Sequence, residues 1–483
     1  MSHQRVYDHI DEHIDEHVAM LQEYVRQPSV SVDGIGIRDC AELVAGYYRD
    51  LGCQEVELIE TDGAPGIWAY YDAGAPKTIV NYNMYDVRPV GPESAWEHPP
   101  FGAVIEDRDD LPQVIYGRGA SVPKGPYTAW LCALKSIIAT EGTLPVNIAF
   151  LAEGEEILGS PNYAVLIDRY RDRLAGIQGC LYLRSTQNLQ GELPLVLGYK
   201  GLLTFEVEAS AEAWGRGPTV SPAHSATKAI VDSPVWRLVH ALATMTTPDG
   251  NTPLVEGIRS PFIEPMEPLP EDEELISNLL THYAGQSWDA IIPGLAGAGV
   301  KKYVNDIEGP DILRRYMYGS TFNIQGLYSG FTGPGTRTFT IPDRATALFD
   351  ARLLTDLSPE EVIDAIRTHL ESSGFADVQV RIKGGYSWSR TSINAPLVQS
   401  FLQTVENYGG RPIVWPFQGY GGPWSIFSSD FGAPVVFSTG IGHGGGVGQP
   451  DEYFVLDGGG KVPGLREIER FCVDLLYDFA DRS

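Results

Sequence analysis

The chain of 483 residues is long enough to form two domains, each with a hydrophobic core of its own. Its content of 43% apolar and 20% charged residues is typical of an ordinary globular protein in water. A net charge of −28 argues against nucleic acid and anionic membranes as partners, because both bind basic surfaces.

The N-terminus and the cysteines predict a cytoplasmic protein. The N-terminus, MSHQRVYDHIDEH, is charged from its first residues and lacks the apolar segment of a signal peptide. No uninterrupted apolar run reaches the ~18 residues of a membrane-spanning helix, so no membrane contact is expected. Five scattered cysteines without C-x-x-C spacing are typical of reduced thiols in a protein core.

The first predicted element is a helix over residues 8–26. Apolar residues recur on one of its faces with helical periodicity, at Ile10, Ile14, Val18, Leu21 and Val25. His9, His13 and His17 follow one another at intervals of four residues, a spacing that suits a metal ion. Acidic residues alternate with them, so we interpret this run as a solvated helix face and not as a metal site.

Three apolar runs, at 78–85, 146–152 and 434–438, predict buried strands that are each followed by a glycine-rich or acidic loop. Helical segments such as 126–140 and 161–173 lie between them. This alternation indicates an α/β fold with a mostly parallel sheet covered by helices on both faces. Ligands bind beyond the carboxyl ends of such strands, where Asp86, Glu156 and Gly448 are expected to converge.

A second domain is predicted from about residue 203, where LTFEVEASAEA alternates like a half-exposed strand. We therefore divide the chain into an α/β domain of catalytic type and an inserted domain. The first is formed by residues 1–202 and 387–483, and the second by residues 203–386.

Five segments carry a resemblance to a known family. They read NYNMYDVRPVGPESAWEHPPF at 81–101, GRGASVPKGP at 117–126, EGEEILGSPN at 153–162, RSTQN at 184–188 and GQPDEYF at 448–454. In this order, and over nearly the whole chain, they resemble the carnosinase/aminoacylase family of zinc dipeptidases and amidohydrolases. The resemblance implies that the inserted domain is an α+β, ferredoxin-like domain that serves as a lid and in dimerisation.

The metal-ligand positions of that family hold other residues here. They fall on Met84, Val122, Ile157, Ser185 and Gly448. Zinc prefers imidazole, carboxylate or thiolate ligands, which none of these five side chains supplies. In a shifted alignment, Glu155 and Glu156 would stand for the family's paired glutamates, which restores a single ligand. We therefore predict a site without metal or another cofactor.

Five other positions match functional residues of the family, and the resemblance gives each a role. Glu156 corresponds to the general base, and Asp86 to the residue that orients a metal-bound histidine. His224 corresponds to a histidine that reaches the substrate of the partner subunit, with simple packing as the alternative. Asn323 and Arg352 correspond to substrate-binding residues; Arg352 would bind a carboxylate, with an intramolecular salt bridge as the alternative.

The acidic residues around Glu156 predict its protonation behaviour. Glu153, Glu155 and Asp86 crowd the same region without a cation to offset them, which predicts a raised pKa for Glu156. A raised carboxylate pKa suits acid/base catalysis near neutral pH. Glu153 and Glu155 themselves are interpreted as solvated loop residues.

Four more residues are expected to contact the substrate. Arg184, next to Ser185, and Lys124, at the K-G-P position of the family, would bring positive charge to the space that zinc ions occupy in the family. Ser185 would face the same space. His443 lies in the segment GIGHGGG, whose glycines allow close approach of the backbone to a ligand.

Three functions are compatible with these residues. The leading hypothesis is a metal-independent enzyme that acts on a small amino-acid-derived or dipeptide-like substrate with a carboxylate. Glu156 would be its general acid/base in proton abstraction or amide-bond chemistry. The second is a ligand-binding protein without catalysis, and the third is a zinc dipeptidase with unusual ligands such as Asp86, Glu155 and His443. A homodimer is expected, because His224 is useful only if it reaches a partner's site.

Overall fold

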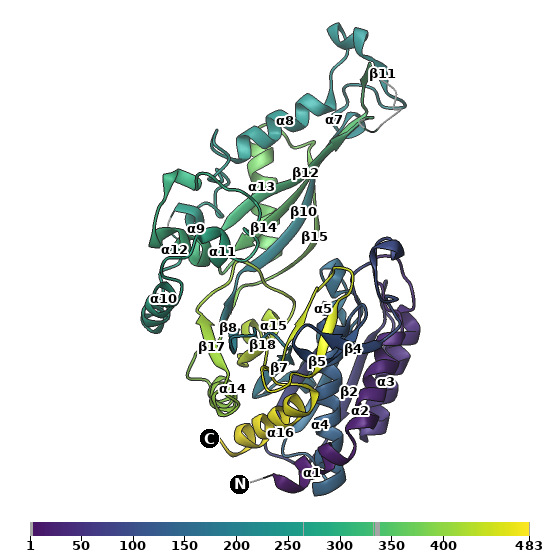
Figure 1. Cartoon of the computed structure of the whole chain (residues 1–483). Helices are drawn as coiled ribbons and strands as arrows, with labels where there is room; N and C mark the ends of the chain where they lie inside the picture. The colour runs from purple at the N-terminus through teal and green to yellow at the C-terminus, as the bar shows by residue number, and fades with distance from the viewer. Residues whose placement is uncertain (1–2, 264, 332, 334–338, 483) are drawn as a thin grey trace. The chain divides into compact units, whose positions relative to one another are not determined.

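The computed structural model describes residues 3–263, 265–331, 333 and 339–482, which form two compact units (Figure 1). Unit 1 contains the chain up to Leu197, Arg390–Trp415 and the residues from Ile426 onward. Unit 2 contains Gly198–Ser389 and Pro416–Ser425. The predicted division after residues 202 and 386 stands beside observed boundaries after Leu197 and Ser389.

The short segment Pro416–Ser425 needs a correction, because the sequence analysis places it in the first domain and it belongs to unit 2. Its residue Gln418 donates its backbone N–H to the carbonyl oxygen of Gly198 and accepts a hydrogen bond from the hydroxyl of Tyr316. These contacts join residues about 100–220 positions apart, which no local pattern reveals.

Unit 1 is built on a sheet of six strands. In spatial order they are β1 (Glu55–Ile59), β2 (Gly66–Tyr71), β6 (Asn147–Glu153), β3 (Thr78–Met84), β7 (Gly179–Leu183) and β18 (Val435–Thr439). The pairs β6–β3, β3–β7 and β7–β18 are parallel, whereas β2 is antiparallel to β1 and β6. Every residue of β6 and β7 is buried, so both faces of the sheet are covered. The predicted α/β fold with a mostly parallel sheet is confirmed.

Helices surround this sheet. They include α1 (Gln4–Glu12), α2 (Ile14–Arg26), α3 (Ile37–Leu51), α4 (Gly125–Glu141), α5 (Tyr163–Arg169), α6 (Arg171–Leu174), α14 (Pro396–Asn407) and α16 (Leu465–Asp481). The helix α4 packs against α1, α2 and α16, while α3 packs on β1 and β2. None of the described helices is both long and apolar enough to cross a lipid bilayer.

The helix predicted over residues 8–26 is two helices, because His13 leaves helical backbone angles (φ −112°, ψ 11°) between α1 and α2. The interpretation of its histidines as a solvated face is wrong for His17. That side chain is 7% exposed, and its Nδ1 lies 2.8 Å from a carboxylate oxygen of Glu469 in α16. Acidic residues near His17 in sequence point elsewhere, so the local pattern misled the prediction.

A second, antiparallel sheet of unit 1 holds the glycine-rich segment near the C-terminus. Its strands are β19 (Gly444–Gly445), β20 (Tyr453–Asp457), β5 (Leu111–Tyr116) and β4 (Val104–Arg108), in that spatial order. Glu452, just before β20, accepts hydrogen bonds from the backbone N–H groups of Ser121 and Val122 and from Arg118. This buried carboxylate therefore ties three loops together.

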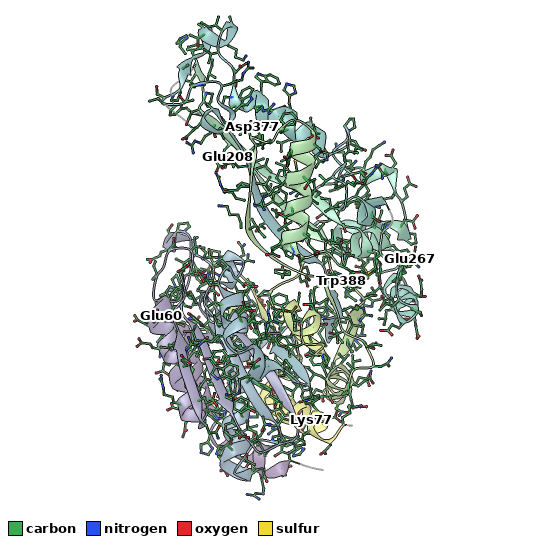
Figure 2. The ribbon with its side chains drawn as sticks, turned by 180° about the vertical axis from the view of Figure 1, so that it is seen from behind. Glu60, Lys77, Glu208, Glu267, Asp377 and Trp388 are labelled. Carbon is green, nitrogen blue, oxygen red and sulfur yellow. The ribbon has the colours of Figure 1, made fainter. Side chains whose placement is uncertain are left out.

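Unit 2 contains an antiparallel sheet in the order β12 (Thr321–Ser329), β14 (Arg344–Leu353), β10 (Gly201–Ser210) and β15 (Gln379–Tyr386). With α8 (Pro234–Met245) after β10 and α13 (Pro359–Ser372) after β14, the chain follows the β-α-β-β-α-β order of a ferredoxin-like domain. The core lies between the helices and one face of the sheet, where Phe205, Phe349 and Ile366 are buried. An ion pair of Arg237 with Asp377 (labelled in Figure 2) ties α8 to the loop before β15.

A largely helical insertion lies between α8 and β12. It contains α9 (Ser260–Ile263), α10 (Pro270–His282), α11 (Trp288–Ile291) and α12 (Pro310–Tyr318). Pro at the start of α10 and α12 fits the first helical turn, where no intrahelical donor is needed. The last of these helices, α12, supplies residues to the cavity described below.

Candidate active site

The carboxyl ends of the parallel strands in unit 1 bring the predicted site residues together. Strand β3 ends at Met84, β6 at Glu153, β7 at Leu183 and β18 at Thr439. The loops after these strands carry, in turn, Asp86, Glu156, Arg184 with Ser185, and the glycine-rich segment 440–448. Carboxyl ends of neighbouring parallel strands meet at one edge, so the fold forms a binding site there.

Asp86 positions the turn that carries Glu156. Its carboxylate accepts hydrogen bonds from the backbone N–H of Glu156 at 3.2 Å, the backbone N–H of Ile157 at 3.1 Å and the hydroxyl of Ser31 at 2.7 Å. Burial raises the pKa of Asp86 to about 6, although these three hydrogen bonds favour the ionised form. Asp86 therefore fixes the backbone of Glu156 and has little capacity left for another ligand.

The carboxyl of Glu156 titrates near neutral pH. Burial is the largest cause that raises its pKa to about 7, the negative charge of Asp86 adds to it, and Arg184 and Arg88 oppose the rise. The predicted rise is confirmed, but its main cause is burial and not the crowding of carboxylates. Arg88 is a site residue that the sequence analysis missed; its position two residues after Asp86 was the available indication.

Glu153 and Glu155 are buried, with 4% and 8% of their surface exposed, so their interpretation as solvated loop residues is wrong. Glu153 accepts hydrogen bonds from the hydroxyls of Tyr82 at 2.7 Å and Ser160 at 2.8 Å, and burial holds its pKa well above the ordinary value. Glu155 accepts from the side-chain amide of Asn162 at 2.7 Å. Both carboxyls are part of the packed loop that supports Glu156.

Arg88 lies over Gly448, one of the five positions at which the family has a metal ligand. Gly448 has a φ of +75°, and a Cβ atom there would lie 2.7 Å from Cδ of Arg88. The absence of a side chain at Gly448 therefore makes room for the arginine. On β7's side, Arg184 donates to the hydroxyl of Ser438 at 3.0 Å. Two guanidinium groups thus act on Glu156.

Ser185 and the residues around it line the same edge of the sheet. Its hydroxyl is buried and has no hydrogen-bond partner among the described residues. A Cβ atom at Gly442 would lie 2.9 Å from that hydroxyl, so the glycine-rich loop passes directly over Ser185. The hydroxyl is therefore free to bind a ligand at this edge.

Two of the predicted substrate contacts have structural roles. The ammonium of Lys124 is fully buried and donates to the carbonyl oxygens of Tyr24 at 3.0 Å and Gln27 at 2.5 Å, at the C-terminal end of α2. In His443, Nδ1 lies 2.8 Å from the carbonyl oxygen of Gln187 and Nε2 lies 3.0 Å from the hydroxyl of Tyr453. Neither side chain has a free polar atom for a substrate, and we do not retain them as contacts.

The residues at the carboxyl edge do not fit a di-zinc centre. Zinc in proteins is held by at least three His, Cys or carboxylate ligands in close array. Within the part of the chain that the structure describes, only His17, Cys132 and Glu469 place three such donor atoms within 4.8 Å of one another. These three belong to α2, α4 and α16 and not to the loops around Asp86.

In unit 2, Asn323 and Arg352 lie on the same face of the sheet. Asn323 of β12 is paired in register with Asp350 of β14, and its amide donates to that carboxylate at 2.8 Å. Arg352 lines a cavity of about 770 Å³. Among the described residues, its buried Nη1 has no hydrogen-bond partner and no carboxylate forms an ion pair with it. The intramolecular salt bridge that was the alternative for Arg352 is absent from this part of the chain.

His224 and Arg352 lie at opposite ends of unit 2. His224 belongs to the short strand β11 (Ala223–His224), which pairs with β13 (Thr340–Ile341) just before β14 begins at Arg344. Arg352 lies eight residues further along β14, about 26 Å at a rise of ~3.3 Å per residue. Figure 1 shows β11 at the end of this unit that is remote from α12. The exposed His224 therefore cannot share a ligand with Arg352 of its own unit.

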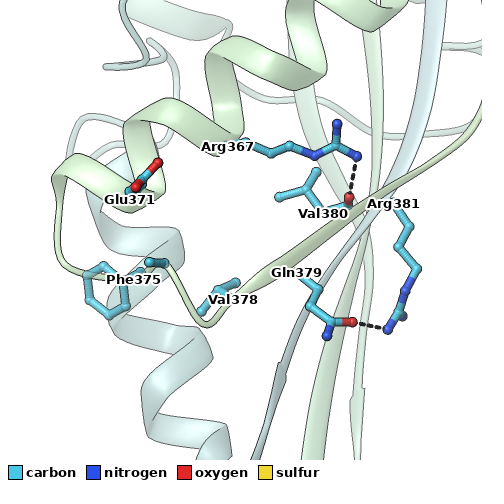
Figure 3. A pocket seen from close by; sticks show the side chains of 8 residues that line it. Arg367, Glu371, Phe375, Val378, Gln379, Val380 and Arg381 are labelled. Carbon is cyan, nitrogen blue, oxygen red and sulfur yellow. Dashed lines mark hydrogen bonds between the residues drawn. The ribbon is translucent and has the colours of Figure 1, made fainter. Parts of the chain in front are cut away.

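Another hollow of unit 2 is an unsuitable site. It lies between α13 and β15 and has a volume of about 480 Å³ (Figure 3). Its cations are already engaged: Arg367 donates to the carbonyl oxygen of Val380 at 2.9 Å, and Arg381 donates to Glu208 at 3.0 Å and to Gln379. No described residue of this hollow matches a predicted functional position.

Comparison with known proteins gives concordant matches. The family model described as "Peptidase family M20/M25/M40" matches residues 83–461. The chain is 25% identical over 389 residues to Cys-Gly metallodipeptidase dug1 of Schizosaccharomyces pombe, covering 77% of this chain and 76% of that protein. It is 29% identical over 329 residues to Beta-Ala-His dipeptidase of Rattus norvegicus, covering 67% and 61%. Among solved structures, the M20 family metallo-carboxypeptidase Sso-CP2 from Sulfolobus solfataricus matches with a TM-score of 0.80 and 27% identity over 96% of this chain and 99% of that chain.

Proposed function

The chain belongs to peptidase family M20/M25/M40, and from this we propose that it is a divergent, metal-independent enzyme of amide-bond chemistry. Its substrate is a small, dipeptide-like molecule with a carboxylate, as the names of the dipeptidase relatives suggest. The observation that carries the proposal is the environment of Glu156: a carboxyl with a pKa of about 7, held by Asp86 and faced by two guanidinium groups. The family's ligand positions beside it carry no His, Cys or carboxylate side chain.

Glu156 acts as the general acid and base. Near neutral pH about half of its carboxyls are ionised, so the group accepts a proton from the attacking nucleophile and returns it to the leaving nitrogen. Attack on the substrate's carbonyl carbon places negative charge on the carbonyl oxygen, and Arg184 and Arg88 supply the positive charge that stabilises it. Asp86 is a positioning residue, because it bonds the backbone of Glu156 and not the reacting atoms.

The choice of nucleophile separates two reactions of this type. Without a Lewis acid, water keeps a pKa near ~16, whereas bound zinc lowers it to ~7. An amine is nucleophilic without that help, and an α-amino group has a pKa of ~8. We therefore favour acyl transfer to an amine over hydrolysis; proton abstraction next to a carbonyl would use the same base.

The unit 2 residues complete the site in this proposal. Arg352 binds the substrate carboxylate, because it lines the cavity with an unpartnered buried nitrogen. His224 acts on the substrate of a partner subunit, since it cannot reach Arg352 of its own unit. A homodimer is supported by the edge strand β12, where Ile324, Leu327 and Tyr328 are large apolar side chains with 41–58% of their surface exposed.

A zinc dipeptidase with unusual ligands is disfavoured by the same geometry. Asp86 already accepts three hydrogen bonds, and both ring nitrogens of His443 have partners. A ligand-binding protein without catalysis remains as the competing function. It differs in one measurable respect, because it needs ligand affinity and no turnover.

The decisive experiment compares Glu156→Gln with Glu155→Gln. Turnover is measured by mass spectrometry on Cys-Gly, β-Ala-His and N-acyl amino acids, with an amine acceptor present and absent. We expect Glu156→Gln to lower turnover by ~10²–10⁴ with little change in ligand affinity, the usual contribution of a positioned acid/base. Glu155→Gln is the matched control, because its neighbouring side chain keeps the hydrogen bond from Asn162. Full turnover in Glu156→Gln would remove the base from the mechanism.

A chelator experiment tests metal independence. Protein dialysed against EDTA is expected to keep its turnover, and elemental analysis is expected to find no transition metal that His17→Ala leaves in place. The His17 variant matters because His17, Cys132 and Glu469 are the one described group with three donor atoms in close array. Loss of turnover on chelation, with recovery on adding zinc or manganese, would contradict the proposal.

A further inference from the structure

The cavity that contains Arg352 carries an excess of positive charge. Three cationic side chains line it: Lys200 just before β10, Arg315 of α12 and Arg352 of β14. Its only lining carboxylate is Asp350, which already accepts a hydrogen bond from Asn323. The whole chain has a net charge of −28, so a group of three cations with one engaged carboxylate stands against the general composition.

Arg352 differs from the other cations on its face of the sheet. Alternation along β14 buries Phe349 and Ala351 in the core and places Arg352 on the opposite face. On β15, Arg381 pairs with Glu208 at 3.0 Å and Lys383 pairs with Glu206 at 3.0 Å. Glu208 is labelled in Figure 2. Arg352 has no such partner among the described residues, so its charge is available to a ligand.

The same contrast occurs between two neighbours on α12. Arg314 forms a two-pronged ion pair with Glu273 of α10, at 2.8 and 2.9 Å. Arg315 has no carboxylate partner within the described chain, and it lines the cavity. The helix thus uses one arginine for packing between helices and presents the next one to the cavity.

Lys200 is the third cation and is almost completely buried, with 2% of its surface exposed. Its ammonium donates to the carbonyl oxygens of Tyr316 and Gly319, which leaves one of its three N–H groups unused by these bonds. Burial and the nearby charges of Arg315 and Arg352 lower the pKa of Lys200 to about 7. Three cations are therefore held close enough to repel one another, and an anion would relieve that repulsion.

We propose that this cavity binds a ligand end with two anionic groups, of the kind found in an acidic amino acid with a free α-carboxylate. One group binds Arg352 and the other binds Arg315 with Lys200. This rests on the proposed role of Arg352 in holding a substrate carboxylate, and it narrows the substrate to dipeptide-like molecules with an acidic residue at that end. The second anionic group is a carboxylate or a phosphate, since both have the acceptor oxygens that guanidinium groups prefer.

The test compares two ligands of nearly identical shape by isothermal titration calorimetry on the full chain. N-acetyl-L-glutamate has two carboxylates, whereas N-acetyl-L-glutamine has one. We expect glutamate to bind at least ~10-fold more tightly, within the range measured for close charge pairs. Arg315→Gln should abolish this preference and leave glutamine binding unchanged, whereas Arg352→Gln should weaken both ligands. Arg314→Gln is the matched control and should keep the preference.

The result is independent of catalysis, because the titration also works on Glu156→Gln protein. N-acetyl-O-phospho-L-serine is the third ligand and distinguishes a phosphate from a carboxylate as the second anionic group. Tighter binding of either acidic ligand than of glutamine supports the proposal. Equal affinity for all three in the wild-type protein, or an unchanged preference in Arg315→Gln, overturns it. Failure of turnover in the wild type with a retained preference would refute the enzyme and not the pocket.

Discussion

Arg88 and Arg184 oppose the rise in the pKa of Glu156 that burial and Asp86 produce. The result, a pKa of about 7, is a balance of four contributions, so each of them is a handle on catalysis. Arg88 is the more exposed of the two arginines, which makes it the easier one to replace without damage to the core.

The first prediction concerns the pH profile. If Glu156 is the base, it must be ionised, so kcat/KM should rise as pH increases through about 7 and level off above that. Replacement Arg88→Ala removes a cation that favours the carboxylate, so the pKa of Glu156 should increase and the rising limb should move to higher pH. Arg38→Ala, which removes an exposed arginine paired with Glu60, is the control. A limb that stays in place in Arg88→Ala would separate Arg88 from Glu156.

Lys124 allows a structural role to be told from a substrate contact. Its buried ammonium donates to two carbonyl oxygens at the end of α2, and Lys124→Met would leave them without this donor. We expect a loss of about 1–3 kcal/mol in the free energy of unfolding, measured with urea, and an unchanged KM in the folded protein. Lys461→Met removes an exposed ion pair with Asp110 and should cost little. A raised KM in Lys124→Met would restore this residue to the substrate site.

At the scale of elements, the loop over β18 and β20 places Gly448 against Arg88. Both Gly448 and Gly460 have a positive φ, at +75° and +78°, but a Cβ atom would contact Arg88 only at Gly448 and would meet open space at Gly460. Replacement of either by Ala should lower the free energy of unfolding by about 1–2 kcal/mol, the cost of a left-handed backbone for an L-residue.

The two glycine variants should differ in function. Gly448→Ala displaces Arg88, so it should shift the pH profile of kcat/KM to higher pH, as Arg88→Ala does. Gly460→Ala should leave the profile unchanged. The comparison is made on the folded enzyme at equal concentration, with urea unfolding as the measure of stability. Identical profiles in both variants would show that the contact between Gly448 and Arg88 has no catalytic role.

Much of the fold follows from patterns in the sequence. The apolar runs that end at β3, β6 and β18 are long and bounded by loops, so the strands and the parallel sheet are predictable. The break at His13 and the burial of Glu153 are not, because both depend on contacts that arise only in the folded chain. Glu153 is buried since Tyr82 and Ser160 supply its hydrogen bonds, and neither is adjacent to it in sequence.

The candidate site divides in the same way. Glu156, Asp86 and Arg352 stand at positions that a motif identifies, whereas Arg88 became visible only through its distance to Gly448. The cavity of unit 2 is also invisible in sequence, because Lys200, Arg315 and Arg352 are separated by 37 to 152 residues. Lys124 shows the opposite error: it occupies a motif position, and its neighbours in space use its charge for structure.

At the scale of the whole molecule, assembly is the main prediction. A homodimer should appear in multi-angle light scattering at micromolar concentration, and Leu327→Glu on the edge strand β12 should weaken it. Leu254→Glu, at another exposed position of unit 2, is the control. A monomer with full activity would contradict both the assembly and the proposed role of His224.

A mixing experiment tests the role of His224 directly. Glu156→Gln and His224→Ala protein are each expected to be inactive, because each lacks one residue of every site. In a mixed dimer, one site takes Glu156 from one subunit and His224 from the other, so exchange of subunits should restore about a quarter of the sites. No recovery after exchange, shown to be complete by mass spectrometry, would exclude a shared site.

The order of strands in unit 1 also has a consequence for biosynthesis. Strand β7 ends at Leu183, and its parallel neighbour β18 begins at Val435, so about 250 residues separate the two partners. At a synthesis rate of 5–20 residues per second, β7 waits roughly 10–50 s on the ribosome with one edge unpaired. This apolar edge is a template for wrong pairing during that time. The nascent chain therefore depends on protection of β7 until nearly all of the protein has been made.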